Sequence, residues 1–376
     1  MDQITKRPDT SKDRFAADPA VSYTLPAWMY FEPETLREET DAIFTKSWIY
    51  VAHSSELAEP GQYVTAEITG QRIYVIRTGE GELKAFFNVC QHRGHSLLRG
   101  KGRARNLLVC PYHSWSYDHD GRLRAAPNCE HVKDFDKSEF SIPQVQVEVF
   151  AGFVFVNLDA DARPMGEVYP GAEQRLLEAC PGTAELTTAR EIVFDIKGNW
   201  KNVGDNLLEC YHCSTAHKAF VDLVEMPTYQ VETHDNWSIQ WGECRSDNSA
   251  YGFDAVSAVT TNTTLYLWPT IAFAKFPGTD GIATFTFMPT EPELTHQVFA
   301  YHAPVEPMTE TELKALDYFQ DVLGPEDVSL VEDVQRGLHS LGYHQGRFMV
   351  DGERSAISEH AAHHFQNLVA KSLGMV

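Results

Sequence analysis

The sequence predicts an α+β protein of two parts, a small all-β part and a larger part in which helices pack on an antiparallel sheet. Short β-rich runs bounded by Gly, Asp and Pro fill residues 51–158, which indicates the all-β part. The rest of the chain alternates helical and strand-like segments. A length of 376 residues is enough for two to three domains. We expect the small part at residues 45–159, and the larger part to combine residues 1–44 with 160–376.

The elements before and within the small part follow from hydrophobic periodicity. Apolar residues at near-helical spacing, from Leu36 to Trp48, predict an amphipathic helix over residues 34–48. Runs rich in β-branched and aromatic residues predict strands at 63–68, 72–77 and 152–158.

The larger part shows longer elements. A helix is expected at 171–180, a strand at 186–196 and an alternating sheet within 229–287. Thr309-Glu310-Thr311-Glu312 has the capping-box pattern of a helix start. Gly324-Pro325 is expected to end that helix, with a second one over 326–341.

Composition excludes several classes of function. With 31 basic and 53 acidic residues the formal charge is -22, which disfavours nucleic acid and anionic membranes as partners. The first residues lack the apolar region of an export signal, and no stretch approaches the length of a membrane span. The seven cysteines show no paired framework typical of secreted scaffolds. We therefore expect a cytoplasmic protein.

Two Cys/His pairs indicate a metal centre. Cys90-Gln91-His92 is followed, after seventeen residues, by Cys110-Pro111-Tyr112-His113. Zinc also binds two thiolates and two imidazoles, but zinc fingers usually pair Cys with Cys and His with His. In a Rieske [2Fe-2S] cluster two Cys hold one iron and two His hold the other. One ligand of each kind in each segment favours the Rieske cluster over zinc.

Two neighbours of these pairs support the same interpretation. Gly94, after the first pair, allows a tight turn. Trp115, after the second pair, either covers the loop or belongs to the ordinary core.

A second group of candidate ligands lies within residues 199–217. Taken as a helix, this segment places Asn202, Asp205, Glu209 and His212 on one face, which is either a solvated face or a set of metal-site residues. Within it, Cys210 and Cys213 form a CxxC pattern, which by itself is a weak signal for redox activity or metal binding.

His212 and His217 are candidates for a two-histidine, one-carboxylate iron(II) site, which leaves three coordination positions open. They are five residues apart, about 140° around a regular helix, so both reach one metal only where the helix ends or bulges between them. Ser214 and Thr215 make such a break plausible. The alternative is that both histidines are structural.

Asp327 is the candidate third ligand. It extends the apolar stripe of the late helix by one turn, and a carboxylate on a core-facing stripe is costly unless it is paired or binds a metal. We expect its neighbour Glu326, and also Glu332 and Asp333, to point elsewhere. The alternative role for Asp327 is a carboxylate that the helix dipole favours near the N-terminus.

The motif Cys90-x-His92-Arg93-Gly94 with Cys110-Pro111-Tyr112-His113-x-Trp115 resembles the large, catalytic subunit of the Rieske non-haem iron oxygenases. The resemblance implies a START-like helix-grip catalytic domain and a mononuclear Fe(II). It implies that His212, His217 and Asp327 hold this iron. It also implies that Glu209 bridges a ligand histidine and a cluster histidine of a neighbouring subunit, in a homotrimer.

The same resemblance implies an O2-dependent reaction fed by NAD(P)H. The chain has no dinucleotide fingerprint and no plant-type ferredoxin spacing, so a separate flavin/iron-sulfur reductase is expected to supply the electrons. The remaining alternatives are an oxygenase of aromatic rings or aryl ethers and a Rieske electron carrier without its own chemistry.

The substrate is indicated less directly. Glu209 in place of the more common Asp, and the tail Ile357 to His360 with Phe365, resemble oxygenases of carnitine, glycine betaine, proline betaine and related quaternary amines. Such substrates need aromatic faces for cation–π contacts. The candidates, which alternatively form ordinary core, are Trp237, Trp241, Tyr266, Trp268 and Phe273. Arg245 and Lys275 are candidates for a substrate carboxylate. N-demethylation and C–N cleavage both remain open.

Overall fold

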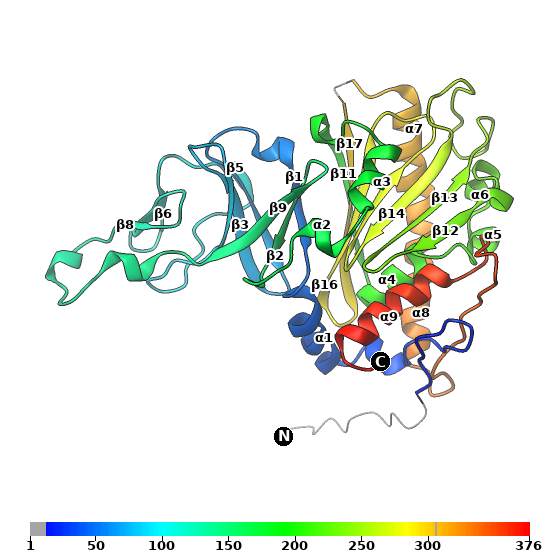
Figure 1. Ribbon diagram of the computed structural model, residues 1–376, viewed down its shortest axis with the longest axis horizontal. Helices are drawn as coiled ribbons and strands as arrows, with labels where there is room; N and C mark the ends of the chain where they lie inside the picture. The colour runs from blue at the N-terminus through cyan, green and yellow to red at the C-terminus, as the bar shows by residue number, and fades with distance from the viewer. Residues whose placement is uncertain (1–12, 305–306) are drawn as a thin grey trace. The chain divides into compact units, whose positions relative to one another are not determined.

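The computed structural model describes residues 13–304 and 307–376. The chain forms two compact units (Figure 1). Of the described residues, the large unit contains 13–42, 191–299 and 307–376, and the small unit contains 43–190 and 300–304.

The small unit is built on a seven-stranded sheet of order β1-β10-β9-β4-β3-β2-β5 and a three-stranded sheet of order β6-β7-β8. The strands are β1 (Ile49–His53), β2 (Gln62–Ile68), β3 (Gln71–Arg77), β4 (Leu83–Phe87), β5 (Lys101–Arg103), β6 (Leu108–Val109), β7 (Ser116–Tyr117), β8 (Leu123–Ala125), β9 (Gln144–Phe150) and β10 (Phe153–Asn157). The strands expected at 63–68, 72–77 and 152–158 therefore form, with ends that differ by one residue.

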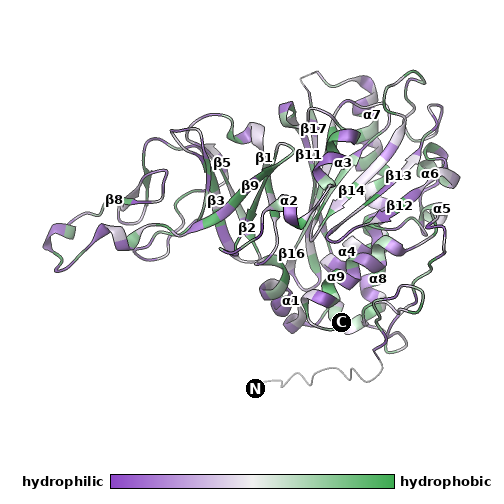
Figure 2. Ribbon diagram, in the orientation of Figure 1, coloured by the Kyte–Doolittle hydropathy of each residue, from purple (hydrophilic) through white to green (hydrophobic). Residues whose placement is uncertain are grey.

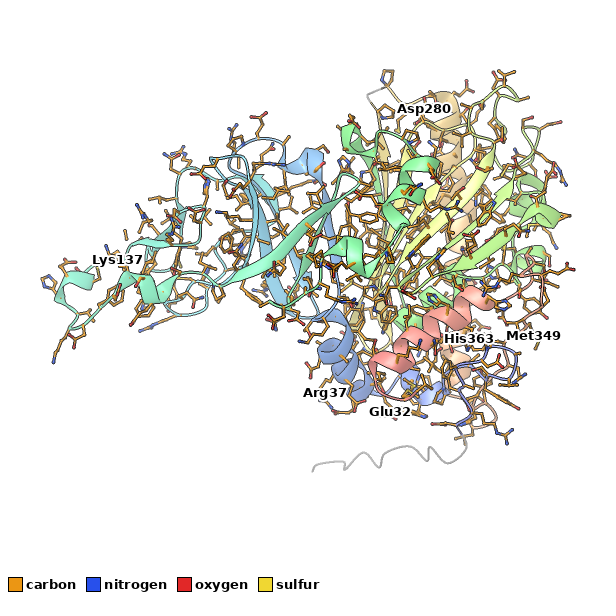
Figure 3. All side chains as sticks on the ribbon, in the orientation of Figure 1. Glu32, Arg37, Lys137, Asp280, Met349 and His363 are labelled. Carbon is orange, nitrogen blue, oxygen red and sulfur yellow. A yellow bond between two sulfur atoms is a disulfide. The ribbon has the colours of Figure 1, made fainter. Side chains whose placement is uncertain are left out.

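Short helices complete the small unit. They are η4 (Ser54–Leu57), η5 (Cys129–His131), η6 (Lys137–Phe140), α2 (Met165–Val168), α3 (Ala172–Ala179) and η7 (Thr183–Glu185). Figure 3 shows Lys137 on η6, in the excursion between β8 and β9. This unit runs to residue 190 rather than 159, because the added segment contacts the turn between β9 and β10. In that turn, Ala151 N donates to Glu173 Oε1 (2.7 Å), and Thr183 Oγ1 donates to Ala151 O (2.6 Å).

The large unit contains a seven-stranded sheet of order β11-β17-β16-β15-β14-β13-β12, in which the strands from β12 to β16 pair antiparallel. The strands are β11 (Thr187–Ile196), β12 (Gln230–Thr233), β13 (Trp237–Glu243), β14 (Thr261–Leu267), β15 (Ile271–Lys275), β16 (Ile282–Glu291) and β17 (Leu294–Ala303). The predicted α+β fold with an antiparallel sheet is thus confirmed.

The helices of the large unit begin with η2 (Ala27–Tyr30) and α1 (Pro33–Glu39), after which the π-helical turn η3 (Thr40–Phe44) ends the helix expected over 34–48. The others are α4 (Trp200–Leu207), α5 (Cys213–Ala216), α6 (Lys218–Leu223), η8 (Met226–Thr228), α7 (Glu310–Tyr318), η9 (Phe319–Leu323), α8 (Gly324–Leu338) and α9 (His360–Ser372). Helix α4 contacts α8, α9 and β16, so it lies at the centre of this layer.

Helix α9 illustrates how the helices of the large unit pack. It mixes hydrophilic and hydrophobic residues, as expected for a helix with one face on a core (Figure 2). His363, labelled in Figure 3, is buried on α9, and its Nε2 lies 2.9 Å from Ala16 O.

The helix over residues 310–338 contradicts one expectation. Gly324-Pro325 does not interrupt it, because α7 continues through the π-helical turn η9 directly into α8. Gly324 has helical φ and ψ of -60° and -49°, and Pro325 lies in the first turn of α8, where its missing N–H is tolerated. A Cβ on Gly324 would lie 2.9 Å from the ring of Phe194, so this glycine allows close packing rather than a break.

Candidate active site

Two loops of the small unit present the Cys/His pairs in the same backbone conformation. In the first, Cys90 N donates to His95 O (2.8 Å) and Gly94 N to Cys90 O (2.9 Å). In the second, Cys110 N donates to Trp115 O (2.8 Å) and Ser114 N to Cys110 O (2.9 Å). Gly94 has a φ of 72°, the left-handed conformation of the tight turn expected there. Ser114 occupies the equivalent position of the second loop, with a φ of 61°.

The side chains of these loops converge. The Cys90 and Cys110 thiols are buried and close enough for a hydrogen bond, and burial raises the pKa of Cys110. The rings of His92 and His113 lie 4.6 Å apart. Among the described residues, His113 Nδ1 is buried without a hydrogen-bond partner. A pair of buried thiols and a pair of imidazoles, one with a buried and unpaired nitrogen, fit the ligand set of a Rieske cluster.

Aromatic residues pack against these loops from the core of the unit. Trp115 stacks on the ring of His92 (4.8 Å, 7°), packs edge-on against Phe140 and belongs to the buried core of this unit, the second of the two roles considered for it. Tyr117 OH accepts a hydrogen bond from Gln91 N (3.0 Å) and lies 3.4 Å from Cys90 Sγ.

In the large unit, the segment from Leu208 to His217 departs from the continuous helix considered in the sequence. Helix α4 ends at Leu207, and the short helix α5 has His212 as its N-cap and His217 as its C-cap. The break therefore precedes His212 instead of falling at Ser214 and Thr215. It still brings both imidazoles to one point.

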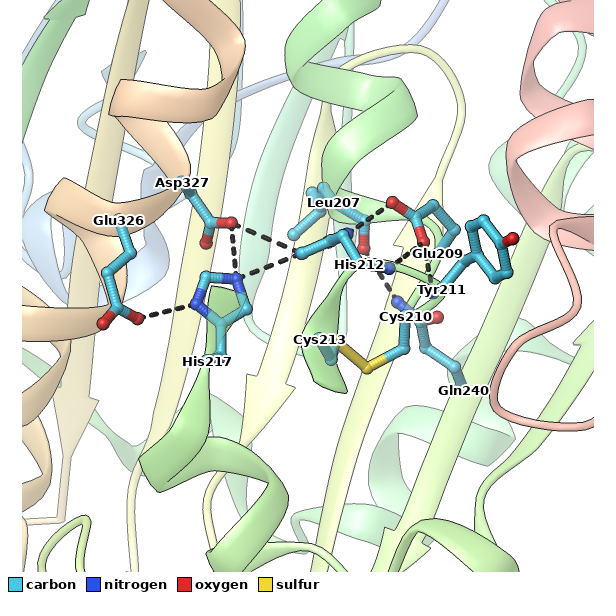
Figure 4. Close-up of a disulfide and its surroundings, with 10 residues drawn as sticks. All are labelled: Leu207, Glu209, Cys210, Tyr211, His212, Cys213, His217, Gln240, Glu326 and Asp327. Atoms are coloured by element: carbon cyan, nitrogen blue, oxygen red, sulfur yellow. Dashed lines mark hydrogen bonds and ion pairs between the residues drawn. A yellow bond between two sulfur atoms is a disulfide. The ribbon is translucent and has the colours of Figure 1, made fainter. Parts of the chain in front are cut away.

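Three predicted ligand atoms form a triangle (Figure 4). His212 Nε2 lies 3.0 Å from His217 Nε2, His217 Nε2 lies 2.9 Å from Asp327 Oδ1, and His212 Nε2 lies 3.6 Å from the same oxygen. Two ligands at right angles on one metal, each at about 2.1 Å, are separated by about 3 Å. The triangle therefore has the dimensions of a facial metal site.

The other nitrogen of each imidazole contacts a carboxylate. His212 Nδ1 donates to Glu209 Oε1, and His217 Nδ1 lies 2.7 Å from Glu326 Oε2. The expectation that Glu326 points elsewhere is wrong, because at the start of α8 it reaches back to α5. With the proton on Nδ1 of each ring, both Nε2 lone pairs face one another and Asp327, an arrangement that only a positive charge between them stabilises.

The pKa values of His212 and Asp327 also indicate that the triangle favours a positive charge. Burial lowers the pKa of His212, but hydrogen bonds to Asp327 and Glu209 outweigh it and raise the value to about 10. For Asp327, burial raises the pKa, but hydrogen bonds to His212 and His217 lower it overall. Without a metal, protons take the place of the cation in the triangle.

A cavity of about 100 Å³ adjoins the triangle. Both histidines and Asp327 line it, as do Glu209, Cys210 and Cys213. Its aromatic walls are Phe220, Tyr229, Phe276, Phe285 and Phe319, and polar side chains come from Asn206, Gln240, Asn262 and Thr264. Within the described part of the chain, this lining includes no lysine or arginine.

None of the five aromatic residues suggested by the sequence lines this cavity. On β13 the cavity side carries Gln240, so Trp237 and Trp241 point to the opposite face. On β15 the cavity side carries Ala274, so Phe273 points away in the same manner.

The other two aromatic residues belong to the core. Tyr266 and Trp268 pack against Phe365 of α9, with ring centroids 6.1 Å and 5.9 Å away. The polar residues of β13 and β14 were the feature of the sequence that could have indicated the cavity wall, since they alternate with core residues and face the cavity.

The two candidate cations are also placed elsewhere. Lys275 Nζ is buried and donates to Thr279 O (2.7 Å) and Gly281 O (2.8 Å). Arg245 Nε lies 3.8 Å from Glu225 Oε1, with a side chain 49% exposed. Neither lines the cavity.

Comparison with known proteins identifies the family. Residues 47–136 match the model of the Rieske [2Fe-2S] domain, and residues 183–374 match that of the ring hydroxylating alpha subunit, catalytic domain. The chain belongs to the Rieske non-haem iron oxygenases. Such an oxygenase carries a Rieske [2Fe-2S] cluster and a mononuclear iron, and the two donor sets described above fit these groups.

Individual relatives of this Rieske oxygenase are similar over nearly the whole chain. It is 41% identical to the carnitine monooxygenase oxygenase subunit of Acinetobacter baumannii, over 99% of each chain. It is 30% identical to the chloroplastic choline monooxygenase of Spinacia oleracea, over 94% of this chain and 79% of that protein. A crystal structure of a quaternary ammonium Rieske monooxygenase with its substrate L-carnitine matches with a TM-score of 0.87 and 40% identity, covering 98% of this chain and 99% of that one.

Among the described residues, every helix is too short or too polar to span a bilayer.

Proposed function

We propose that this chain is the oxygenase component of a Rieske monooxygenase that hydroxylates a quaternary ammonium compound of the betaine or carnitine type. O2 is the oxidant, and a separate flavin/iron-sulfur reductase passes on electrons from NAD(P)H. The observation that carries the chemistry is the triangle of His212, His217 and Asp327 beside a cavity. A mononuclear iron held by these three residues would supply O2 activation beside the cavity.

In this proposal each donor has a defined task. His212 and His217 would bind the iron through Nε2 and Asp327 through a carboxylate oxygen. Glu209 and Glu326 hold the proton on each Nδ1 and so fix the ring orientation. In the cluster, Cys90 and Cys110 would hold one iron and His92 and His113 the other.

The cavity supports a compact cationic substrate group. Its volume of about 100 Å³ is below the roughly 300–1,000 Å³ typical of pockets for drug-sized ligands, which favours a small head group over fused rings. Its aromatic walls offer faces for cation–π contact. The similarity to carnitine and choline monooxygenases supports the same class.

Gln240 adds a polar contact of defined direction. Its Nε2 donates to Leu207 O (2.9 Å), which fixes the amide orientation. Among the described residues its Oε1 is buried without a hydrogen-bond partner, in the cavity wall. We propose that this oxygen faces the polarised methyl groups of the ammonium or accepts from a substrate hydroxyl, since a buried acceptor without a partner is costly.

Two outcomes of the reaction are compatible with the site. Hydroxylation of an N-methyl carbon gives a hemiaminal that breaks down to formaldehyde and a demethylated amine. Hydroxylation of the chain carbon next to nitrogen releases trimethylamine. A substrate carboxylate would be bound by neutral amides and hydroxyls such as Asn262 and Thr264, because lysine and arginine are missing from the described lining.

We further propose that Glu209 bridges to a cluster histidine of a neighbouring subunit in a homotrimer. Glu209 contacts His212, and it also lines a second cavity of about 300 Å³. His92 is exposed on its loop, where another protein can approach it. We place the reaction in the cytoplasm, together with the NAD(P)H reductase.

The test is reductase-coupled O2 consumption with carnitine, glycine betaine, proline betaine, choline and aromatic acids, with formaldehyde and trimethylamine measured as products. We expect uptake with at least one quaternary amine, together with an equal amount of one of the two products. Uptake only with aromatic acids would favour the aromatic-ring alternative. No uptake with any substrate, despite a reducible cluster, would favour an electron carrier.

A further inference from the structure

Cys210 and Cys213 are joined by a disulfide directly beside the candidate iron site (Figure 4). The residues between them are Tyr211 and His212, so the bridge closes the turn that carries a proposed iron ligand. Cys213 N also donates to Cys210 O (3.1 Å), so the turn has a hydrogen bond that does not depend on the bridge.

Both sulfur-bearing residues line the cavity that adjoins His212, His217 and Asp327. Their side chains are otherwise buried, with relative exposures of 4% each. A small oxidant inside the cavity therefore reaches them, whereas a large reagent in solvent does not. Cys244, in the same unit, lies outside this lining and is a free thiol.

We propose that Cys210 and Cys213 are a reversible dithiol/disulfide pair in the wall of the catalytic cavity, and that hydrogen peroxide oxidises it. One thiol attacks the O–O bond, which yields a sulfenic acid and water. The second thiol attacks the sulfenic sulfur, which forms the S–S bond and releases a second water. Two electrons pass from the two sulfurs to one peroxide, and a dithiol reductant reverses the step by thiol–disulfide exchange.

The oxidised pair is compatible with an assembled metal site. With the bridge formed, His212 Nε2 and His217 Nε2 lie 3.0 Å apart, at the spacing of two ligands on one metal. The bridge thus fixes the turn around His212 while peroxide is present, and the reduced turn is held by its backbone hydrogen bond.

The peroxide in this scheme can come from the site itself. Two-electron reduction of O2 without substrate hydroxylation gives hydrogen peroxide in the same cavity. This source rests on the proposed function, but the reaction of the pair with added peroxide does not.

The experiment uses the holoprotein, reduced under anaerobic conditions with dithiothreitol, which is then removed. Hydrogen peroxide is added in equimolar steps, catalase ends each step, and free thiols are alkylated after unfolding and assigned by peptide mass mapping. We expect alkylation of Cys210 and Cys213 to disappear together after about one equivalent of peroxide. The segment that contains both cysteines should then be two hydrogens lighter than its reduced form. Dithiothreitol should restore both thiols, and Cys244 should remain alkylated throughout.

The Cys213→Ser variant removes the second thiol and distinguishes the steps. We expect a sulfenic acid at Cys210 that dimedone traps, in place of the bridge. The proposal is overturned if Cys244 and Cys129 are oxidised before the pair, or if the pair is oxidised irreversibly to sulfinic acid. Peptide mapping of the unsubstituted protein tests the proposal even if the variant does not fold. If the protein shows no oxygenase turnover, the reaction of the two cysteines with added peroxide can still be measured.

Discussion

At His212 and His217 the site chemistry is decided by which ring nitrogen carries the proton. Glu209 and Glu326 each bind an Nδ1, so both Nε2 lone pairs are directed into the triangle with Asp327. A neutral imidazole oriented in this way is the usual metal ligand in proteins. The carboxylate partners are therefore as much a part of the proposed iron site as the three ligands.

Loss of the Glu326 carboxylate should weaken iron binding. In Glu326→Ala, the Nδ1 of His217 loses its acceptor, and we expect iron affinity to fall by about 10- to 100-fold, as for other partners of metal-bound histidines. The measurement is iron retained per chain after dialysis against a graded chelator series. Asp333→Asn is the control, since Asp333 is on the same helix but contacts Arg336. Equal iron retention in all three proteins would contradict the orienting role.

Recognition of the ammonium charge can be tested with a matched ligand pair. Glycine betaine and 3,3-dimethylbutanoate have the same shape, but a neutral carbon replaces the charged nitrogen in the second. If the aromatic walls hold the cation, 3,3-dimethylbutanoate, which lacks the positive charge, should bind at least tenfold more weakly, since a desolvated cation–π contact is worth about 2 kcal/mol. Competition during substrate turnover gives both constants. Equal inhibition by the two compounds would show that shape alone is recognised.

The sequence was informative about ligands and misleading about the cavity wall. Cys/His spacing and the apolar stripe before Asp327 are local patterns, so the ligand candidates could be predicted. Which face of a strand meets the cavity depends on what packs on each side. On β13, Trp237 and Gln240 lie on opposite faces of the strand. We expected the tryptophan to face the substrate, but it is Gln240 that lines the cavity.

At the level of elements, α4 is held in place by a glycine contact with α9. A Cβ on Gly204 would lie 2.5 Å from Cζ of Phe365, whose ring is fully buried. Glycine is therefore needed here for close helix packing, despite its cost of about 1 kcal/mol in a helix. Because α4 leads directly into the His212 turn, this contact also positions the iron site.

We expect Gly204→Ala to destabilise the protein by about 1–3 kcal/mol, since the extra methyl group displaces a packed ring. Gly337→Ala is the matched control on α8, because Gly337 is exposed and nothing lies within 4 Å of the place that its added methyl group would take. That substitution should stabilise by about 0.5–1 kcal/mol through helix propensity. Urea unfolding followed by circular dichroism measures both. A Gly204→Ala protein as stable as the control would contradict the packing argument.

Helix continuity at Gly324 shows why one element was predicted incorrectly. Glycine followed by proline usually ends a helix. Here the π-helical turn η9 precedes the pair, and the ring of Phe194 leaves no room for a side chain at Gly324. That contact joins residues far apart in sequence, so no local pattern reveals it.

The protein should lose stability in acid through His302, which lies in the last part of β17, within the residues assigned to the small unit. Burial, and then the neighbouring His53, lower the pKa of His302 to about 3. The folded state keeps this ring neutral, whereas the unfolded chain takes up a proton near pH 6.5. Stability is therefore retained above pH 6.5 and falls below it, approaching about 1.4 kcal/mol per pH unit from this group.

We expect His302→Asn to reduce the loss of unfolding free energy between pH 7.5 and 5.5. Asparagine places an amide where His302 Nδ1 contacts Thr188 Oγ1 (3.2 Å). His131→Asn is the control, since its side chain is 79% exposed. Urea titrations at both pH values test this, and an unchanged pH dependence in His302→Asn would show that the acid sensitivity arises elsewhere.

At the scale of the whole molecule, two units carry two iron centres with different ligands. The small unit offers two thiols and two imidazoles, and the large unit two imidazoles and a carboxylate. The first set is suited to storing an electron and the second to binding O2 and substrate. The two-part organisation was visible in the sequence, but the extent of the small unit was not, because residues up to 190 join it through contacts with the turn between β9 and β10.

The most direct test of this two-centre account is Mössbauer spectroscopy of the anaerobically reduced protein, enriched in 57Fe, compared with His212→Ala. The account predicts about three irons per chain in the unsubstituted protein, two in the cluster and one as high-spin Fe(II). In His212→Ala the single high-spin Fe(II) signal should disappear, the cluster signal should remain, and substrate turnover should be lost. A high-spin Fe(II) signal and turnover that both survive the substitution would contradict the assignment of the mononuclear site.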